Sequence, residues 1–237
     1  MAVSSFYLTA STAIDAQSPA LTLPATFDLG TLYIGGSKSL LRRTLISFDV
    51  FGAAAEGRPL AASDTPLDAI LECEVLSLSG PAGFPCTIER NARGDWDPMT
   101  ANWNRYRVGA NWTAPGGDVA APPSAIGYAA PSALGAFAIS GVLPLVADAV
   151  AYRGGRVEMR HRSDNETPGS NRYFALAASW NTGTPVRLRV TYQPRHPAPI
   201  DRPRTAGGAM PGARAAPPSP PSAAAAAASP ARPEGGH

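Results

Sequence analysis

The sequence predicts an all-β protein, an antiparallel β-sandwich or jelly roll with one short helix and a disordered Pro/Ala-rich C-terminal tail. Three observations lead to this prediction. Short segments alternate apolar and polar residues with a period of two, as half-buried strands do. Pro and Gly interrupt these segments at frequent intervals. Helical periodicity is scarce, which favours a sandwich over βαβ units.

The strand candidates follow one another along the chain, and each alternating segment is expected to leave one face wet. They are Thr31–Ile34, Leu45–Phe51, Leu71–Val75, Val157–His161 and Val186–Val190. One segment has a different pattern. Apolar residues from Val142 to Val150 predict a short helix that begins near Pro144 and ends before Gly154.

Two cysteines flank a predicted hairpin turn, residues 77–85 (SLSGPAGFP). Cys73 and Cys86 are therefore candidates for a cross-strand bridge. A chain made in a reducing compartment favours free, buried thiols. The free thiols are our expectation, and the disulfide is the alternative.

Composition divides the chain into a predicted β-sandwich domain, residues 6–192, and a predicted disordered tail, residues 193–237. The tail is rich in Pro, Ala and Arg and has few large apolar residues, so it cannot bury enough surface to offset the cost of ordering. The net charge of +2 gives no indication of nucleic-acid binding. No apolar run is long enough to span a membrane. The N-terminus has no secretory-signal pattern, so we expect synthesis in a host cytoplasm without a signal peptide.

Several motifs occur in a recognisable order: RTLISFDV (Arg43–Val50), WDPMTANWN (Trp96–Asn104), a Gly-Gly-Asp turn (Gly116–Asp118), and TPVRLRVTY (Thr184–Tyr192). This order resembles the DNRLRE family of β-sandwich modules, which are carbohydrate-binding-like jelly rolls found on secreted microbial proteins and in phage structural gene clusters. The resemblance covers Phe6 to Tyr192, and Trp96–Asn104 is its most specific part. The chain departs from the secreted members in its N-terminus and in enlarged loops at residues 53–66 and 120–132.

Aromatic residues concentrate between Trp96 and Trp112. Trp96 and Trp103 match the family pattern and are expected in the core. Tyr106 and Trp112 lie in a Gly/Asn-rich stretch and are expected to be exposed. With Trp180 they are our candidate residues for binding a glycan or a protein partner, since aromatic rings stack on sugars and suit interfaces.

The sequence gives little basis for catalysis, and we predict that the chain is not an enzyme. His161 is the one histidine of the predicted domain and is read as a core or edge residue. Two acid pairs, Asp95/Asp97 and Asp164/Glu166, are the types used in glycoside hydrolysis, but in loops they more often cap turns. No cofactor is expected. A structural calcium ion at Ser163–Thr167 and Asp118 is the alternative to turn capping.

In the Phe-Asp motif, we expect Asp49 to pair with Arg42 or Arg43.

From these features we expect a structural or attachment protein of a phage-like virion, either a capsid decoration or a tail or fibre component. The alternative is a carbohydrate-binding module for a cell-surface or extracellular glycan. The expected partners are other virion proteins or further copies of the chain in a homo-oligomer, because virion components are repeated.

Overall fold

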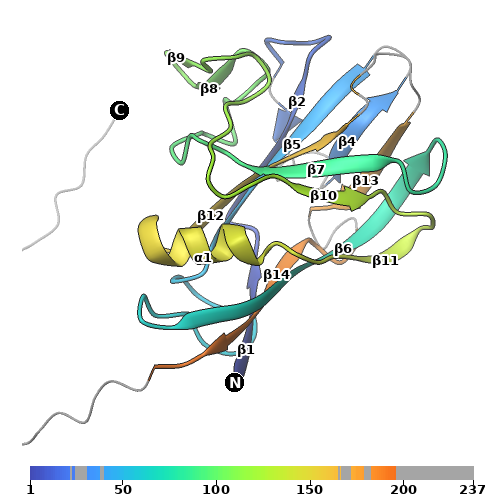
Figure 1. Cartoon of the computed structure of the whole chain (residues 1–237). Helices are drawn as coiled ribbons and strands as arrows, with labels where there is room; N and C mark the ends of the chain where they lie inside the picture. Colours follow the sequence, from blue (N-terminus) through green and yellow to red (C-terminus); the bar gives the residue numbers. More distant parts are fainter. Residues whose placement is uncertain are drawn as a thin grey trace, which may run out of the picture. The chain divides into compact units, whose positions relative to one another are not determined.

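Every strand pairing in the described part of the chain is antiparallel, which confirms the predicted all-β fold class. The computed structural model describes residues 1–21, 23–24, 31–37, 40–164, 166, 172–178 and 183–195. Figure 1 shows the strands and the single helix of this part. Of the predicted tail, residues 193–237, the part from residue 196 on lies outside the described residues, and Gln193 is the last residue of β14.

In chain order the elements are β1 (Ala2–Tyr7), β2 (Ala10–Asp15), β3 (Leu23–Pro24), β4 (Thr31–Ser37), β5 (Leu40–Asp49), β6 (Thr65–Ser79), β7 (Pro85–Arg90), β8 (Arg105–Arg107), β9 (Ala110–Asn111), β10 (Ile126–Ala129), β11 (Gly135–Ile139), α1 (Leu143–Tyr152), β12 (Arg156–Ser163), β13 (Arg172–Ala177) and β14 (Arg187–Gln193). The first strand therefore begins at Ala2 and the last ends at Gln193.

The sheet follows the order β1-β14-β6-β13-β4-β5-β12-β7-β10, with β11 beside β6 and with β2 beside β5 and β3. It folds over on itself. The long strand β6 pairs with β14 along Thr65–Glu72 and with β13 along Val75–Ser79. The layer β1-β14-β6-β11 therefore faces the layer that contains β5, β12, β7 and β10, and β13 joins the two (Figure 1).

The main core lies between these layers. Alternate residues of β6 and β14 point into it, as the period-two pattern predicts. Leu71 and Leu188 from one layer and Phe48 and Met159 from the other are each completely buried there. Phe174 from β13 joins the same cluster.

The predicted helix is confirmed as α1, with Pro144 in its first turn. Its buried side, Leu145, Val146, Ala149 and Val150, packs against β6 of one layer and β12 of the other. The helix ends where Gly154 and Gly155 take positive φ angles of 58° and 82°. The Gly155 N–H then donates to the Ala149 carbonyl at 3.0 Å. Within the described residues, no helix is both long and apolar enough to cross a membrane.

The predicted hairpin at residues 77–85 is wrong. β6 and β7 do not pair with each other, because both edges of β6 are already occupied by β14, β13 and β11. The connection instead carries the chain into the other layer, where β7 pairs with β12 and β10. Cys73 and Cys86 are both free and buried, which confirms the expected thiols. Burial raises the pKa of each thiol to about 12.

Candidate functional site

The outer face of β12 is covered, although its alternating pattern predicted a wet face. Glu158 and Arg160, which alternate with the core residues of β12, are 2% and 6% exposed. The covering segment is residues 91–120, which includes the small hairpin β8-β9. A second apolar cluster forms beneath it, in which Trp96 and Trp112 pack on Ile14 and Leu45 of the sheet. The middle of β12, from Val157 to His161, is therefore buried on both sides.

The expected exposure of Tyr106 and Trp112 is wrong. Their exposed fractions are 9% and 5%, and their ring centroids lie 5.4 Å apart within the second cluster. The Trp112 Nε1–H donates to the Asn102 carbonyl at 2.8 Å, which fixes the indole inward. A ring covered in this way offers no face to a sugar. The third candidate, Trp180, lies outside the described residues.

Trp96 and Trp103 were both expected in the core, and of the two only Trp96 is fully buried. Trp96 is 5% exposed, and its Nε1–H donates to the buried Glu158 carboxylate at 2.5 Å. Burial raises the pKa of Glu158, and the hydrogen bonds from Trp96 and Ser47 oppose that rise. Trp103 is only half-buried, and the Arg43 guanidinium lies 4.7 Å from its ring centroid.

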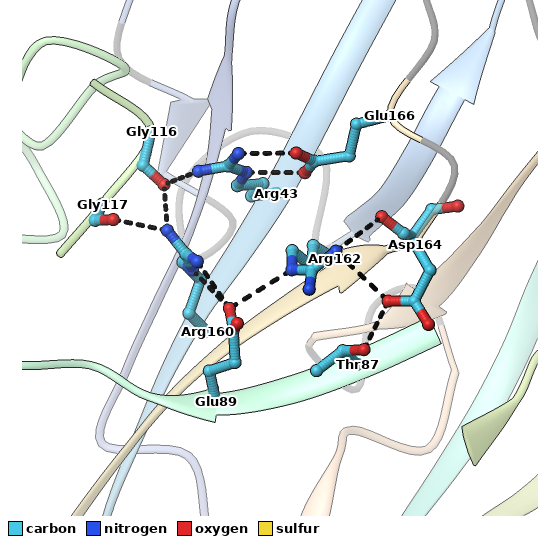
Figure 2. A network of polar contacts seen from close by, with 10 residues as sticks. Arg43, Thr87, Glu89, Gly116, Gly117, Arg160, Arg162, Asp164 and Glu166 are labelled. Atoms are coloured by element: carbon cyan, nitrogen blue, oxygen red, sulfur yellow. Dashed lines mark hydrogen bonds and ion pairs between the residues drawn. The ribbon is translucent and has the colours of Figure 1, made fainter. Parts of the chain in front are cut away.

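A network of arginines and carboxylates holds this covering segment to the sheet (Figure 2). Arg160 of β12 lies directly opposite Glu89 of β7, and the pair is joined at 2.5 Å. Arg160 also donates to the carbonyls of Gly116 and Gly117 in the covering segment. Burial lowers the pKa of Arg160, and the hydrogen bond to Glu89 opposes this shift.

Arg43 of β5 binds the same loop as Arg160, and the two arginines together form what we call the clamp. Its Nε and Nη2 donate to the two carboxylate oxygens of Glu166, both at 2.6 Å, in a bidentate pair. Its Nη1 donates to the Gly116 carbonyl at 2.7 Å. Gly116 takes a φ of +89°, and a Cβ atom there would lie 2.8 Å from the Trp103 ring. The loop can therefore come this close to Trp103 only because residue 116 is glycine.

The acids singled out in the sequence all take part in such contacts. Asp97 caps the turn that follows it, as expected, by accepting from Met99 N–H and Thr100 Oγ1. Asp95 pairs with Arg107 at 2.9 Å. Asp164 accepts from Thr87 Oγ1 and pairs with Arg162 at 3.2 Å. These carboxylates act as turn caps and ion-pair partners.

Asp118 also caps a turn. Burial acts to raise its pKa, but hydrogen bonds from the Thr113 and Ala114 N–H groups and from Arg93 outweigh this and hold the pKa below its ordinary value. In the described part of the chain, no three His, Cys, Asp or Glu side chains gather as a metal site. Residues 165 and 167 of the calcium candidate lie outside the described residues.

The predicted partner of Asp49 is also wrong. Arg42 pairs with Asp15, and Arg43 with Glu166. Asp49 instead accepts the backbone N–H groups of Phe51 and Gly52, at 3.0 and 2.9 Å, where β5 ends. It therefore caps the turn after the strand.

Of the two positions that the sequence allowed for His161, core or edge, the structure shows the core. It is 1% exposed, and burial lowers its pKa to about 3, so the imidazole is neutral at ordinary pH. Neither ring nitrogen has a hydrogen-bond partner within the described residues. The Tyr128 ring meets it edge-on, with centroids 6.2 Å apart.

Two surface hollows lie beside the covering segment. One, of about 560 Å³, is bordered by Arg43, Arg93, Asp118, Arg160, residues 113–115 and Gly117. The other, of about 550 Å³, is bordered by Gly94, Asp95, Tyr152, Arg153 and Arg156. Tyr152 is 84% exposed at the end of α1 and is the most exposed aromatic side chain of the described residues.

No protein-family model matches the chain, and no curated protein matches it either.

The sequence did not point to Glu89, which pairs with Arg160, or to Tyr152, which borders the second hollow. Glu89 became visible only when the register placed β7 beside β12. Tyr152 had a usable signal, because it is the last residue before the Arg-Gly-Gly stop of a predicted helix, where side chains are commonly exposed.

Proposed function

We propose that this chain is a non-enzymatic structural or attachment protein of a phage-like virion, either a capsid decoration or a tail or fibre component. The proposal rests first on the resemblance of Phe6–Tyr192 to DNRLRE modules. The structural observation that supports it is that the charged side chains of the network bind other parts of the same chain. Arg43, Arg160, Glu89 and Glu166 bind each other and the loop carbonyls, so they stiffen the sandwich.

A rigid module of this kind suits repeated use in an assembly. The acids considered for hydrolysis act as turn caps and ion-pair partners, as with Asp97 and Asp164. His161, the histidine considered as a base, is 1% exposed in the core, whereas a general base must come within hydrogen-bond reach of its substrate. These contacts favour a scaffold over a catalyst.

The test is whether the chain travels with particles. Particles released from cells that encode the protein are separated on a density gradient, and each fraction is analysed by quantitative mass spectrometry. We expect the chain to follow the major capsid protein at a constant ratio and to stay bound through a salt wash. A chain found only in the particle-free fractions would refute the proposal.

The second candidate, a carbohydrate-binding module, is favoured by the hollow beside Tyr152. An exposed aromatic ring next to Asp95 and Arg153 combines a stacking face with hydrogen-bonding groups, which is the combination that sugars require. A glycan array tests it with the wild type, Tyr152→Ala, and Tyr7→Ala as the control at another partly exposed tyrosine. Binding lost only in Tyr152→Ala supports this candidate, whereas no binding by the wild type argues against it.

A further inference from the structure

The segment between Asp118 and Asp148 contains no Asp, Glu, Lys, Arg or His. Both β10 and β11 lie inside it. The two strands lie at corresponding edges of the two layers, and the rings of Tyr128 and Phe137 meet between them with centroids 6.4 Å apart. One side of the sandwich is therefore bordered by two strands from an uncharged stretch of chain.

Each of these strands has a free edge among the described residues. β10 pairs only with β7, and β11 pairs only with β6. The outward side chains of β11, Ala136 and Ala138, are small and exposed. Leu134, just before β11, is 63% exposed. The two exposed side chains of β11 itself are therefore both methyl groups.

The edge of β1, in contrast to that of β11 among the described residues, is covered by a loop. There, the loop at residues 55–58 lies against the strand. The Ser5 N–H donates to the Glu56 carbonyl at 3.0 Å, and the Ala55 N–H donates to the Ser5 carbonyl at 2.7 Å. Glu56 and Arg58 add charge beside this edge. Proteins protect sheet edges by such covering and by charge. Among the described residues nothing pairs with the outer edge of β11, and β11 itself carries no charged residue.

We propose that β11 is a self-association surface, on which β11 of a second copy of this chain adds antiparallel across a two-fold axis. The strand itself contains no charged residue, and the charges next to it, Glu72 and Glu74, belong to β6 on its paired side, which argues for this occupant. A partner must bring an uncharged surface that also contains unpaired backbone groups, and the same segment of a second copy has both. A two-fold interface places one patch against itself, so no separate partner surface is needed. The pairing would also cover Leu134 and the half-buried ring of Phe137.

This inference does not depend on the proposed virion role, because it concerns the purified chain alone. The test is sedimentation equilibrium of the full chain over a range of concentrations. We expect a monomer–dimer equilibrium. The double variant Ala136→Lys/Ala138→Lys places like charges against each other in the dimer and is expected to weaken it by about tenfold or more. In the monomer the new lysines lie beside Glu74 and Glu72, so folding is retained.

The matched control adds the same charge elsewhere. Ala53→Lys/Ala151→Lys changes two exposed alanines away from β11 and is expected to leave the dimer unchanged. Crosslinking gives a second measurement. Since both native thiols are buried, Ala138→Cys introduces the one accessible thiol among the described residues. A short bis-maleimide should then produce a covalent dimer, whereas Ala151→Cys should not.

Two results would overturn the proposal. A chain that remains monomeric throughout the concentration range has no such surface. A dimer that the β11 lysines weaken no more than the control lysines do has its interface elsewhere. Far-UV circular dichroism of each variant identifies loss of fold, and the crosslinking result decides the question if the lysine variant does not fold.

Discussion

Replacing His161 with leucine should make the protein more stable, and the gain should grow as the pH falls. The imidazole is 1% exposed, and neither of its nitrogens has a partner among the described residues. Burying a polar group without a hydrogen bond costs about 1–3 kcal/mol in proteins. Leucine has a similar volume and no polar atom. At pH 7.5 we therefore expect the free energy of unfolding to rise by about 1–3 kcal/mol.

The pH dependence follows from the pKa of His161, which burial lowers from 6.5 to about 3. Below pH 6.5 the unfolded chain binds a proton at this residue and the folded chain does not, so stability falls as the pH falls. At pH 5, about 1.5 units below the unfolded pKa, this linkage removes about 2 kcal/mol from the wild type. Leucine has no such proton, so the advantage of the variant should increase by that amount.

Urea unfolding of both proteins at pH 7.5 and pH 5 measures the difference. Other groups that titrate in this range are common to both proteins and cancel in the comparison. Tyr128, whose ring meets that of His161, has a raised pKa and stays neutral in this range. The same holds for Cys86. If the two proteins lose the same stability between pH 7.5 and pH 5, His161 is protonated or hydrogen-bonded in the native state, and the reasoning is refuted.

Three further predictions concern the covering segment and the core. Gly116→Ala should destabilise the protein by about 1–3 kcal/mol more than Gly109→Ala, because both positions have positive φ but only residue 116 lies against the Trp103 ring; equal losses in urea unfolding would contradict the clamp. Trp96→Phe should cost about 1–3 kcal/mol at pH 7.5, because it leaves the Glu158 carboxylate without its Nε1–H donor. The loss should shrink at pH 4, where protonation removes the buried charge, and an equal loss at both pH values would argue against that cause. Cys73 and Cys86 should react with a thiol reagent only after unfolding, because burial raises both pKa values to about 12; rapid labelling of the native chain, followed by absorbance, would show that the core opens.

Local pattern was sufficient for the elements themselves. The alternation in β6 and β14 and the Pro-to-Gly span of α1 predicted their type, because these periods follow from backbone geometry alone. The same pattern gave the wrong environment for β12. Alternation shows that the two faces of a strand differ. It does not show that residues 91–120, which precede β12 in the chain, cover one of its faces.

The sequence by itself determined that this chain forms antiparallel strands and one short helix, since side-chain periodicity and Gly/Pro positions are local properties. Only the tertiary structure decided that Tyr106 and Trp112 are enclosed and that Arg43 and Arg160 clamp a loop. It also decided that β11 pairs on one edge only within the described part of the chain. Each of these depends on which distant strands become neighbours. That choice is made by the summed burial of many side chains and leaves no mark on any single short stretch of sequence.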